Sequence, residues 1–274
     1  MQHRKILLNE HYPFLSDSYL ELYLPDNISE MGRQDQRHPC LLVIPGGGYG
    51  MVSQREGEPI ALHFLPEGFN VFVLHYSVAP VRFPVQLWEV AAAMELIHAN
   101  ADSWHCDPQH IAVLGFSAGG HLAAHYSNCF DCDAVREKFP ESKPVQASVL
   151  CYPVITADPN YAHQGSFVNL LGHYPETPEE LAFFSCDKQV SAHTPPAFLW
   201  HTAADNAVPV MNSLLYAQAL SRFGIPFGLH VFPDGWHGLA TVDNHTNNDL
   251  PETFAPAKAW LPLAKEWLHH TFHS

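Results

Sequence analysis

A serine set among small residues is the first sign of chemistry in this 274-residue sequence. Ser117 stands in "IAVLGFSAGGHLA", where the apolar run at residues 111–114 predicts a buried strand and the segment from Ala118 predicts a helix. The spacing of Gly115, Ser117 and Gly119 matches G-x-S-x-G, a sharp strand-to-helix turn that lifts a serine hydroxyl above the end of a sheet. Side chains in place of the glycines would collide with the neighbouring strand and helix. We therefore predict a nucleophile at Ser117, with a plain structural turn as the alternative.

A serine hydroxyl is a weak nucleophile unless a base accepts its proton, so a histidine and an acid must accompany it. His237 follows the strand predicted at residues 228–233, in the loop "FPDGWHGLAT". Asp205 follows the strand predicted at residues 197–202, in "HTAADNAVPV". Because the carboxyl ends of parallel strands meet at one edge of a sheet, both side chains are expected to reach Ser117. We predict that His237 is the base and that Asp205 holds its tautomer.

Other histidines and acids fit the site less well, although the sequence holds 20 histidines. Two of them lie on the helix after the serine, and two fall inside predicted strands. Two acids lie in an irregular segment, and a third is too close to His237 in the chain to reach the far ring nitrogen. These weaker candidates are His121, His125, His201, His230, Asp158, Asp187 and Asp234.

A glycine-rich loop, "VIPGGGYG" at residues 43–50, follows the apolar run at residues 40–45. Consecutive glycines allow backbone N–H groups to approach a ligand closely. Acyl transfer builds negative charge on a carbonyl oxygen, which such donors stabilise. We expect an oxyanion hole made by the amides of Gly47, Gly48 and Ala118. A phosphate loop is the alternative, but no Gly-Lys-Ser/Thr follows and the Rossmann spacing is absent.

Strands and helices must alternate along the chain to position these residues. The pattern predicts one α/β domain over residues 1–274, with a mostly parallel, doubly wound sheet and helices on both faces. Residues 153–196 break the rhythm and are expected to form a cap-like insertion over the sheet, with one short helix near residues 179–184. The predicted strands are residues 19–24, 40–45, 71–76, 111–115, 147–152, 197–202 and 228–233, and the predicted helices are residues 87–100, 118–128, 212–224 and a last one within 254–272 that Pro262 bends or restarts.

Composition narrows the classes of partner. The net charge of −15 argues against nucleic acid or an anionic membrane surface. No window approaches the roughly 20 apolar residues of a membrane span, and the first residues lack a secretory signal. Six cysteines are scattered, and "CFDC" at residues 129–132 has no second pair to complete a zinc site. We expect free thiols, a cytoplasmic location, no metal and no cofactor.

Five segments together resemble the α/β-hydrolases of the hormone-sensitive-lipase-like and bacterial acetylxylan-esterase-like group. They are "PGGGYG", "HYSVAPVRFPVQLWEV", "GFSAGGHLA", "HTAADNAVPV" and "GWHG", and the similarity runs from about Cys40 to the end. The order Ser117, Asp205, His237 is the order of that fold. The resemblance implies an α/β-hydrolase fold and hydrolysis of short-chain carboxylic esters without a cofactor. It implies the same three catalytic residues and the same oxyanion amides.

Two positions depart from the usual pattern of that group. Pro45 stands where a histidine usually begins the glycine loop, which is typical of the acetylxylan-esterase-like branch and favours sugar acetates as substrates. Ser77 stands where arginine is usual in Tyr-Arg-Leu-Ala-Pro, so the ion pairing of that loop is left open. The long N-terminal cap of the lipase-like branch is also missing. The cover of the site is therefore expected mainly from residues 153–196.

Bulky residues near these loops are expected to limit the acyl group to acetyl through butyryl. The alternatives are a peptidase or amidase resembling the prolyl-oligopeptidase catalytic domain, an arylformamidase, and a non-catalytic binding protein on the same fold. A small ester is the expected partner, and a homodimer is a further prediction. Core contacts and dimer contacts are the two alternatives for Trp260, Leu263 and Trp267. Ordinary core packing is the alternative for each residue expected to line the pocket, and these residues are Tyr49, Phe116, Tyr152, Trp236 and Leu239.

Overall fold

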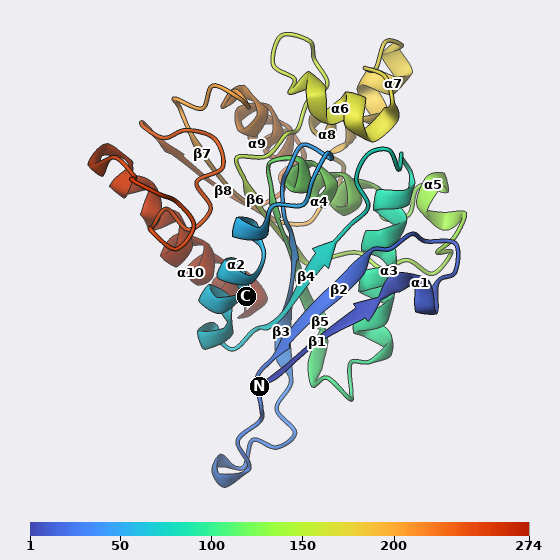
Figure 1. The fold of residues 1–274 in the computed structure, drawn as a ribbon, viewed down its shortest axis with the longest axis vertical. Coiled ribbons are helices and arrows are strands. Elements are labelled where there is room, and N and C mark those ends of the chain that lie inside the picture. The colour runs from blue at the N-terminus through green and yellow to red at the C-terminus, as the bar shows by residue number, and fades with distance from the viewer. Residues whose placement is uncertain (274) are drawn as a thin grey trace.

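An eight-stranded sheet forms the centre of the molecule (Figure 1). The computed structural model describes residues 1–273. The strands lie in the order β1-β2-β4-β3-β5-β6-β7-β8; β2 runs antiparallel to both β1 and β4, and every other pair is parallel. This confirms the predicted α/β class. The strands are β1 (Gln2–Leu7), β2 (Tyr19–Leu24), β3 (His38–Ile44), β4 (Asn70–His75), β5 (Cys106–Phe116), β6 (Ala147–Cys151), β7 (Ala197–Thr202) and β8 (Phe227–Phe232).

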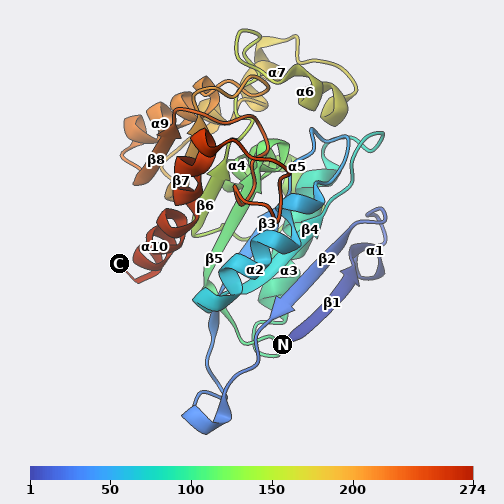
Figure 2. The ribbon, with the colours of Figure 1, turned by 60° about the vertical axis from the view of Figure 1, so that its left-hand side comes forward.

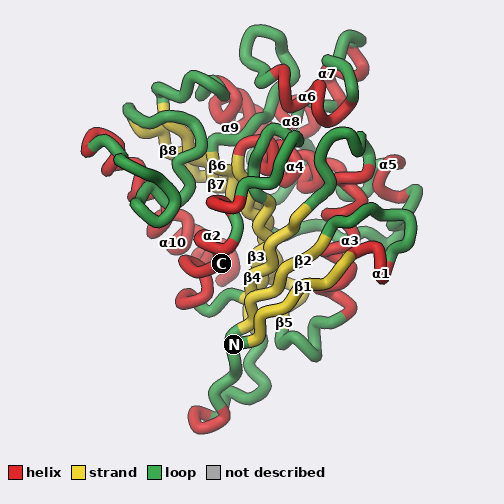
Figure 3. Tube along the Cα trace, in the orientation of Figure 1, coloured by secondary structure: helices red, strands yellow, loops and turns green. Residues whose placement is uncertain are grey.

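Helices cover both faces of the sheet (Figure 3). One face carries α3, α4 and α9, and the other carries α2 and α10. Short 3-10 turns, η1 (Ser29–Met31), η2 (Gln54–Glu56), η3 (Leu65–Glu67) and η4 (Glu252–Ala259), lie in the connections. The helices are α1 (Leu8–His11), α2 (Glu58–Phe64), α3 (Val85–Ala99), α4 (Ser117–Cys129), α5 (Asp133–Arg136), α6 (Gln164–Leu171), α7 (Pro178–Phe183), α8 (Cys186–Gln189), α9 (Met211–Phe223) and α10 (Trp260–His273).

The two faces of the sheet bury separate hydrophobic clusters. In β3, Leu42 and Ile44 pack toward α3 and α4, whereas Leu41 and Val43 pack toward α2 and α10. Side chains of a strand alternate between faces, so a strand covered on both sides must be apolar at every position. This is why the continuous apolar runs identified the central strands. Burying each large aliphatic side chain stabilises the fold by roughly 1.5–3 kcal/mol.

The segment of residues 153–196 lies beyond the carboxyl ends of the central strands, where Figures 1 and 2 show α6 and α7 at the top of the molecule. Helix α7 matches the one helix predicted there, but α6 and α8 were not predicted. Helix α6 is tied to the body: Arg82 donates to the carbonyl of Asn169, and Phe83 N lies 2.9 Å from Leu170 O. These ties fix α6 as a wall over the sheet.

Other departures from the predicted elements have simple causes. Strand β1 is an exposed edge strand with a polar sequence, so it shows no apolar alternation. The last helix begins at Trp260, which places Pro262 in the first turn, where its missing N–H is no loss. Trp260 is buried, and Leu263 and Trp267 pack against the same cluster, so these apolar side chains serve the core of this chain. Among residues 1–273, no helix is both long and apolar enough to cross a bilayer.

The loop after β4 shows which group Ser77 bonds at the position where arginine is usual. Its backbone N–H lies 2.7 Å from Glu89 Oε2, and its hydroxyl donates to Glu89 Oε1. Glu89 lies on α3 and is fully buried. Burial raises the pKa of Glu89 to about 7, although the hydrogen bonds from Ser77 lower it. Two neutral donors on Ser77 therefore occupy this carboxyl group.

Candidate active site

Ser117 sits at the turn between β5 and α4 with a φ of 52°, in the left-handed region that non-glycine residues seldom adopt. The glycines around it are required by close packing. A Cβ atom on Gly115 would lie 2.4 Å from the carbonyl oxygen of Gly119, and one on Gly119 would lie 2.2 Å from that of Ile44. The turn thus has the strained geometry that the G-x-S-x-G spacing predicts. It also sets Ser117 at the N-terminus of α4, where the helix dipole favours negative charge.

The structure brings the three residues of the predicted triad together. His237 Nε2 lies 2.7 Å from Ser117 Oγ, and His237 Nδ1 lies 2.7 Å from Asp205 Oδ2. Asp205 follows β7 and His237 follows β8, so strand ends at one sheet edge supply both, as expected. An ionised carboxylate only accepts hydrogen bonds, so Nδ1 carries the proton and Nε2 is free to accept from the serine hydroxyl. The arrangement can therefore remove a proton from Ser117.

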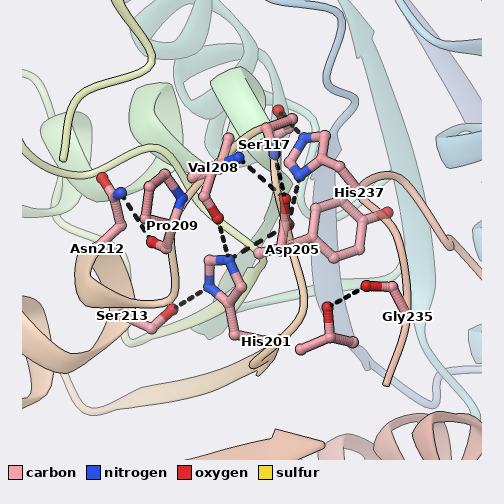
Figure 4. Close-up of polar contacts among 12 residues, drawn as sticks. Ser117, His201, Asp205, Val208, Pro209, Asn212, Ser213, Gly235 and His237 are labelled. Carbon is pink, nitrogen blue, oxygen red and sulfur yellow. Dashed lines mark hydrogen bonds and ion pairs between the residues drawn. The ribbon is translucent and has the colours of Figure 1, made fainter. Parts of the chain in front are cut away.

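A second histidine supports Asp205 from the opposite side (Figure 4). His201 Nε2 lies 3.4 Å from Asp205 Oδ2 and 2.9 Å from the carbonyl oxygen of Val208, while its Nδ1 lies 2.8 Å from Ser213 Oγ. Burial alone would raise the pKa of Asp205, but hydrogen bonds from His201 and His237 outweigh it and hold that pKa well below its usual range. Asp205 is therefore a fixed negative charge behind the imidazole of His237.

The glycine loop after β3 presents backbone amides to the same place. Gly47 and Gly48 line the cavity above Ser117, with φ angles of 123° and 62°. Within residues 1–273, neither of their N–H groups donates to a protein acceptor. Ala118 N is in the first turn of α4, where helical N–H groups have no partner inside the helix. Asn169 Nδ2, on α6, lies 2.9 Å from Gly48 O and holds the loop from above. These amides suit the role of oxyanion donors.

A buried glutamate fixes the loop from below. Glu56 Oε2 accepts from Gly46 N at 2.8 Å, and Oε1 accepts from the Tyr152 hydroxyl at 2.7 Å. The same hydroxyl accepts from Ala240 N at 2.9 Å, and the Tyr152 ring meets the His237 ring edge to face with centroids 5.0 Å apart. One carboxylate thus joins the glycine loop, the end of β6 and the histidine loop. We did not predict this residue from the sequence, where "SQREGEP" carries no motif that points to it.

The cavity at this site has a volume of about 430 Å³, and its lining residues are glycines, Met51 and residues with polar side chains. Three residues of the cap segment that sequence reasoning missed, His163, Gly165 and Asn169, form part of its wall. His163 Nδ1 lies 2.8 Å from Ser166 Oγ, and burial lowers the pKa of His163. The lining residues are Gly47, Gly48, Met51, Ser53, Arg55, Glu56, Ser117, His163, Gly165, Asn169, His237 and Gly238.

The predicted pocket lining needs correction, because none of the five residues lines this cavity. Tyr49 is buried and its hydroxyl lies 2.9 Å from His121 Nδ1, which also explains the burial of that histidine. Phe116, Tyr152 and Leu239 all pack in the cluster on the α2 and α10 face. In strands and tight turns, the direction of a side chain follows the backbone, and here it leads into the core. The fifth residue, Trp236, lines a neighbouring cavity.

No metal-binding cluster is apparent in the part of the chain that the structure describes, since no group of three or more His, Cys, Asp or Glu side chains converges in residues 1–273. All six cysteines are free thiols.

Comparison with known proteins places this geometry in a family. Residues 20–220 match the BD-FAE family model. The chain is 39% identical over 230 residues to endo-1,4-beta-xylanase B of Butyrivibrio fibrisolvens, covering 81% of this chain and 36% of that protein. It is 31% identical over 221 residues to an acetylxylan esterase of Xylanibacter ruminicola, covering 79% of this chain and 42% of that protein. The chain thus spans less than half the length of these two curated relatives.

A solved structure covers the chain almost completely. The acetyl ester-xyloside bifunctional hydrolase from Caldicellulosiruptor lactoaceticus superposes with a TM-score of 0.83 at 37% sequence identity, covering 97% of this chain and 96% of that one. The family model covers most of the chain, and it begins inside β2 and ends in α9, so it includes β3 to β7 and their helices. This chain belongs to the BD-FAE family of α/β hydrolases.

Proposed function

We propose that this protein is a serine esterase that hydrolyses short-chain acyl esters, acetylated sugars among them. The hydrogen-bonded series Ser117, His237 and Asp205, with 2.7 Å at each contact, is the observation that carries the proposal. Relatives named for acetylxylan and acetyl ester-xyloside hydrolysis support the substrate class. The cavity of about 430 Å³ places Arg55, His163 and Asn169, whose side chains can bind sugar hydroxyls, in the same lining as Ser117.

In the proposed mechanism, Ser117 Oγ attacks the ester carbonyl while His237 Nε2 takes its proton. The amides of Gly47, Gly48 and Ala118 donate to the oxyanion of the tetrahedral intermediate. The C–O bond to the alcohol then breaks, and the alcohol leaves with the proton from His237. Water, deprotonated by the same imidazole, attacks the acyl-serine and releases the acid. Asp205 stabilises the imidazolium that forms in each half of the reaction.

The test is Ser117→Ala, assayed on p-nitrophenyl acetate and on acetylated xylo-oligosaccharides. We expect hydrolysis of both esters to fall by about 10⁴-fold or more, because the nucleophile is lost. Circular dichroism checks that the variant is folded. Labelling of the wild type at Ser117 by a fluorophosphonate would separate an enzyme from a non-catalytic binding protein. Full activity in the purified variant would refute the assignment.

Three coarser features complete the proposal. Residues 1–274 act as one domain, with residues 153–196 as a fixed cap over the site. The six free thiols support a reducing, cytoplasmic location, which cell fractionation would test. A homodimer is part of the proposal, and light scattering would detect it.

A further inference from the structure

A second cavity shares one lining residue with the catalytic cavity. It has a volume of about 450 Å³, and Arg55 lines both cavities. Trp236, the residue before His237, lines the second cavity as well. The remaining lining residues come from the loop after the histidine turn and are Asn244, His245, Thr246, Asn247 and Asn248.

The floor of this second cavity is held in place by hydrogen bonds. Arg55 Nη1 lies 3.1 Å from Thr246 O and 3.2 Å from Asn247 Oδ1. Asn247 is buried, and its Nδ2 lies 2.7 Å from Leu239 O. Because Leu239 is two residues beyond His237, the same loop carries the base and the floor. A ligand in this cavity would therefore have a fixed position relative to the base.

The rim of the cavity presents free polar groups beside an exposed aromatic ring. Trp236 is 41% exposed, and its ring meets the edge of Phe254 with centroids 4.7 Å apart, which holds the indole in one orientation. Asn244 and Asn248 are exposed, and within residues 1–273 their side-chain amides have no hydrogen-bond partner. Each of these amides can both donate and accept.

This combination suits one chemical class. A pyranose ring has an apolar C–H face, which an indole can shield from water, and a hydroxyl edge, which amides and a guanidinium can bind. An acyl chain would find little apolar surface among three asparagines and an arginine. We propose that this cavity, here called the Arg55–Trp236 subsite, binds the sugar ring next to the esterified one in an acetylated oligosaccharide. The inference rests on the proposed esterase function and extends it to the alcohol side of the substrate.

The test compares two esters in Trp236→Ala and Trp236→Phe. We expect kcat/KM on acetylated xylo-oligosaccharides to fall roughly tenfold more than kcat/KM on p-nitrophenyl acetate in the alanine variant, mostly through KM. The phenylalanine variant should recover part of that difference, because a ring is restored. Phe223→Ala, an exposed aromatic at the end of α9, is the matched control and should change neither value.

Two further measurements keep the proposal open to refutation. Asn248→Ala should also lower kcat/KM on acetylated xylo-oligosaccharides more than kcat/KM on p-nitrophenyl acetate. This substitution leaves Trp236 and the loop of His237 unchanged. Ser117→Ala should bind acetylated xylotetraose in calorimetry, and the added Trp236→Ala change should weaken that binding. Equal losses on both esters in every variant would overturn the subsite while leaving the esterase intact. A wild type inactive on both esters would instead overturn the proposed function.

Discussion

The two cavities that share Arg55, the catalytic cavity and the Arg55–Trp236 subsite, differ in how their polar groups are bonded. On the catalytic side, Asp205 is buried and bonded to two histidines, and Glu56 is buried between the glycine loop and Tyr152. On the outer side, the amides of Asn244 and Asn248 are exposed and Trp236 faces water. On the catalytic side the carboxylates of Asp205 and Glu56 are hydrogen-bonded within the protein, whereas on the outer side two side-chain amides are left for a ligand.

This contrast separates two tasks. Groups that act on developing charge must be positioned before the substrate arrives, since reorganisation during the reaction would raise the barrier. Groups that bind the alcohol part of the ester can remain hydrated until the substrate binds. Changes on the catalytic side should therefore slow all esters by the same factor, and changes on the outer side should alter the ratio between esters.

The largest expected effect comes from Asp205→Asn. An amide can present its NH₂ to His237, which would favour the wrong tautomer and leave Nε2 unable to accept the serine proton. We expect kcat to fall by about 10⁴-fold on p-nitrophenyl acetate and on acetylated xylo-oligosaccharides alike. Steady-state kinetics on both esters would measure it. If kcat fell by very different factors on the two esters, the proposal that the catalytic residues affect all esters equally would be wrong.

A smaller effect is expected from Glu56→Gln. The carboxylate accepts from Gly46 N–H on one oxygen and from the Tyr152 hydroxyl on the other, and a glutamine can accept on one atom only. One donor would be left unpaired, and the glycine loop or the histidine loop would shift. Since small displacements of such groups cost up to about 100-fold, we expect kcat to fall roughly 10- to 100-fold with little change in KM.

The control for this variant is Glu58→Gln, two residues away on the exposed start of α2. It should keep full activity on both esters. If Glu56→Gln raised KM without lowering kcat, Glu56 would belong to substrate binding and not to positioning. Thermal unfolding of both variants would show whether a lower kcat reflects lost stability.

The smallest effect on catalysis is expected from Glu89→Gln, which lies outside both regions compared here. The folded-state pKa of Glu89, about 7, exceeds its usual value of 4.5, so its contribution to stability is fully present below pH 4.5 and lost as pH rises through 7. The free energy of unfolding should drop by about 3 kcal/mol across that window from this group alone. Urea unfolding of wild type and variant at pH 4.5 and pH 8 would isolate the difference.

In that comparison, the wild type should lose stability relative to Glu89→Gln as the pH rises. Activity at pH 7 should be nearly the same in both proteins. Parallel pH profiles of stability would mean that Glu89 is ionised in the folded protein at neutral pH.

Much of the scaffold follows from sequence because its signals are periodic. Buried parallel strands need apolar residues on both faces, so β3 to β7 are visible as continuous runs, and parallel strand ends share an edge, so Ser117, Asp205 and His237 could be expected to meet. Strand β1 was missed because an exposed edge needs no apolar pattern. Directions of loop side chains were harder to predict. Tyr49, with a φ of 56°, turns inward to His121, and nothing in the spacing of "GGGYG" reveals that turn.

The contacts of Glu56 and of the cap segment could not be predicted from the sequence, for a related reason. Glu56 meets Tyr152 across 96 positions of the chain, and Asn169 meets Gly48 across 121. Such pairs are specified by the finished fold and leave no local pattern. Trp236 was expected beside the substrate, and the structure moves it to the adjoining cavity.

The hydrogen bond from Asn169 to Gly48 has a consequence for how substrate can enter the site. Because this bond joins α6 to the glycine loop, a displacement of α6 would also shift the backbone that we assign to the oxyanion hole. Substrate entry that left α6 in place would keep those amides in position.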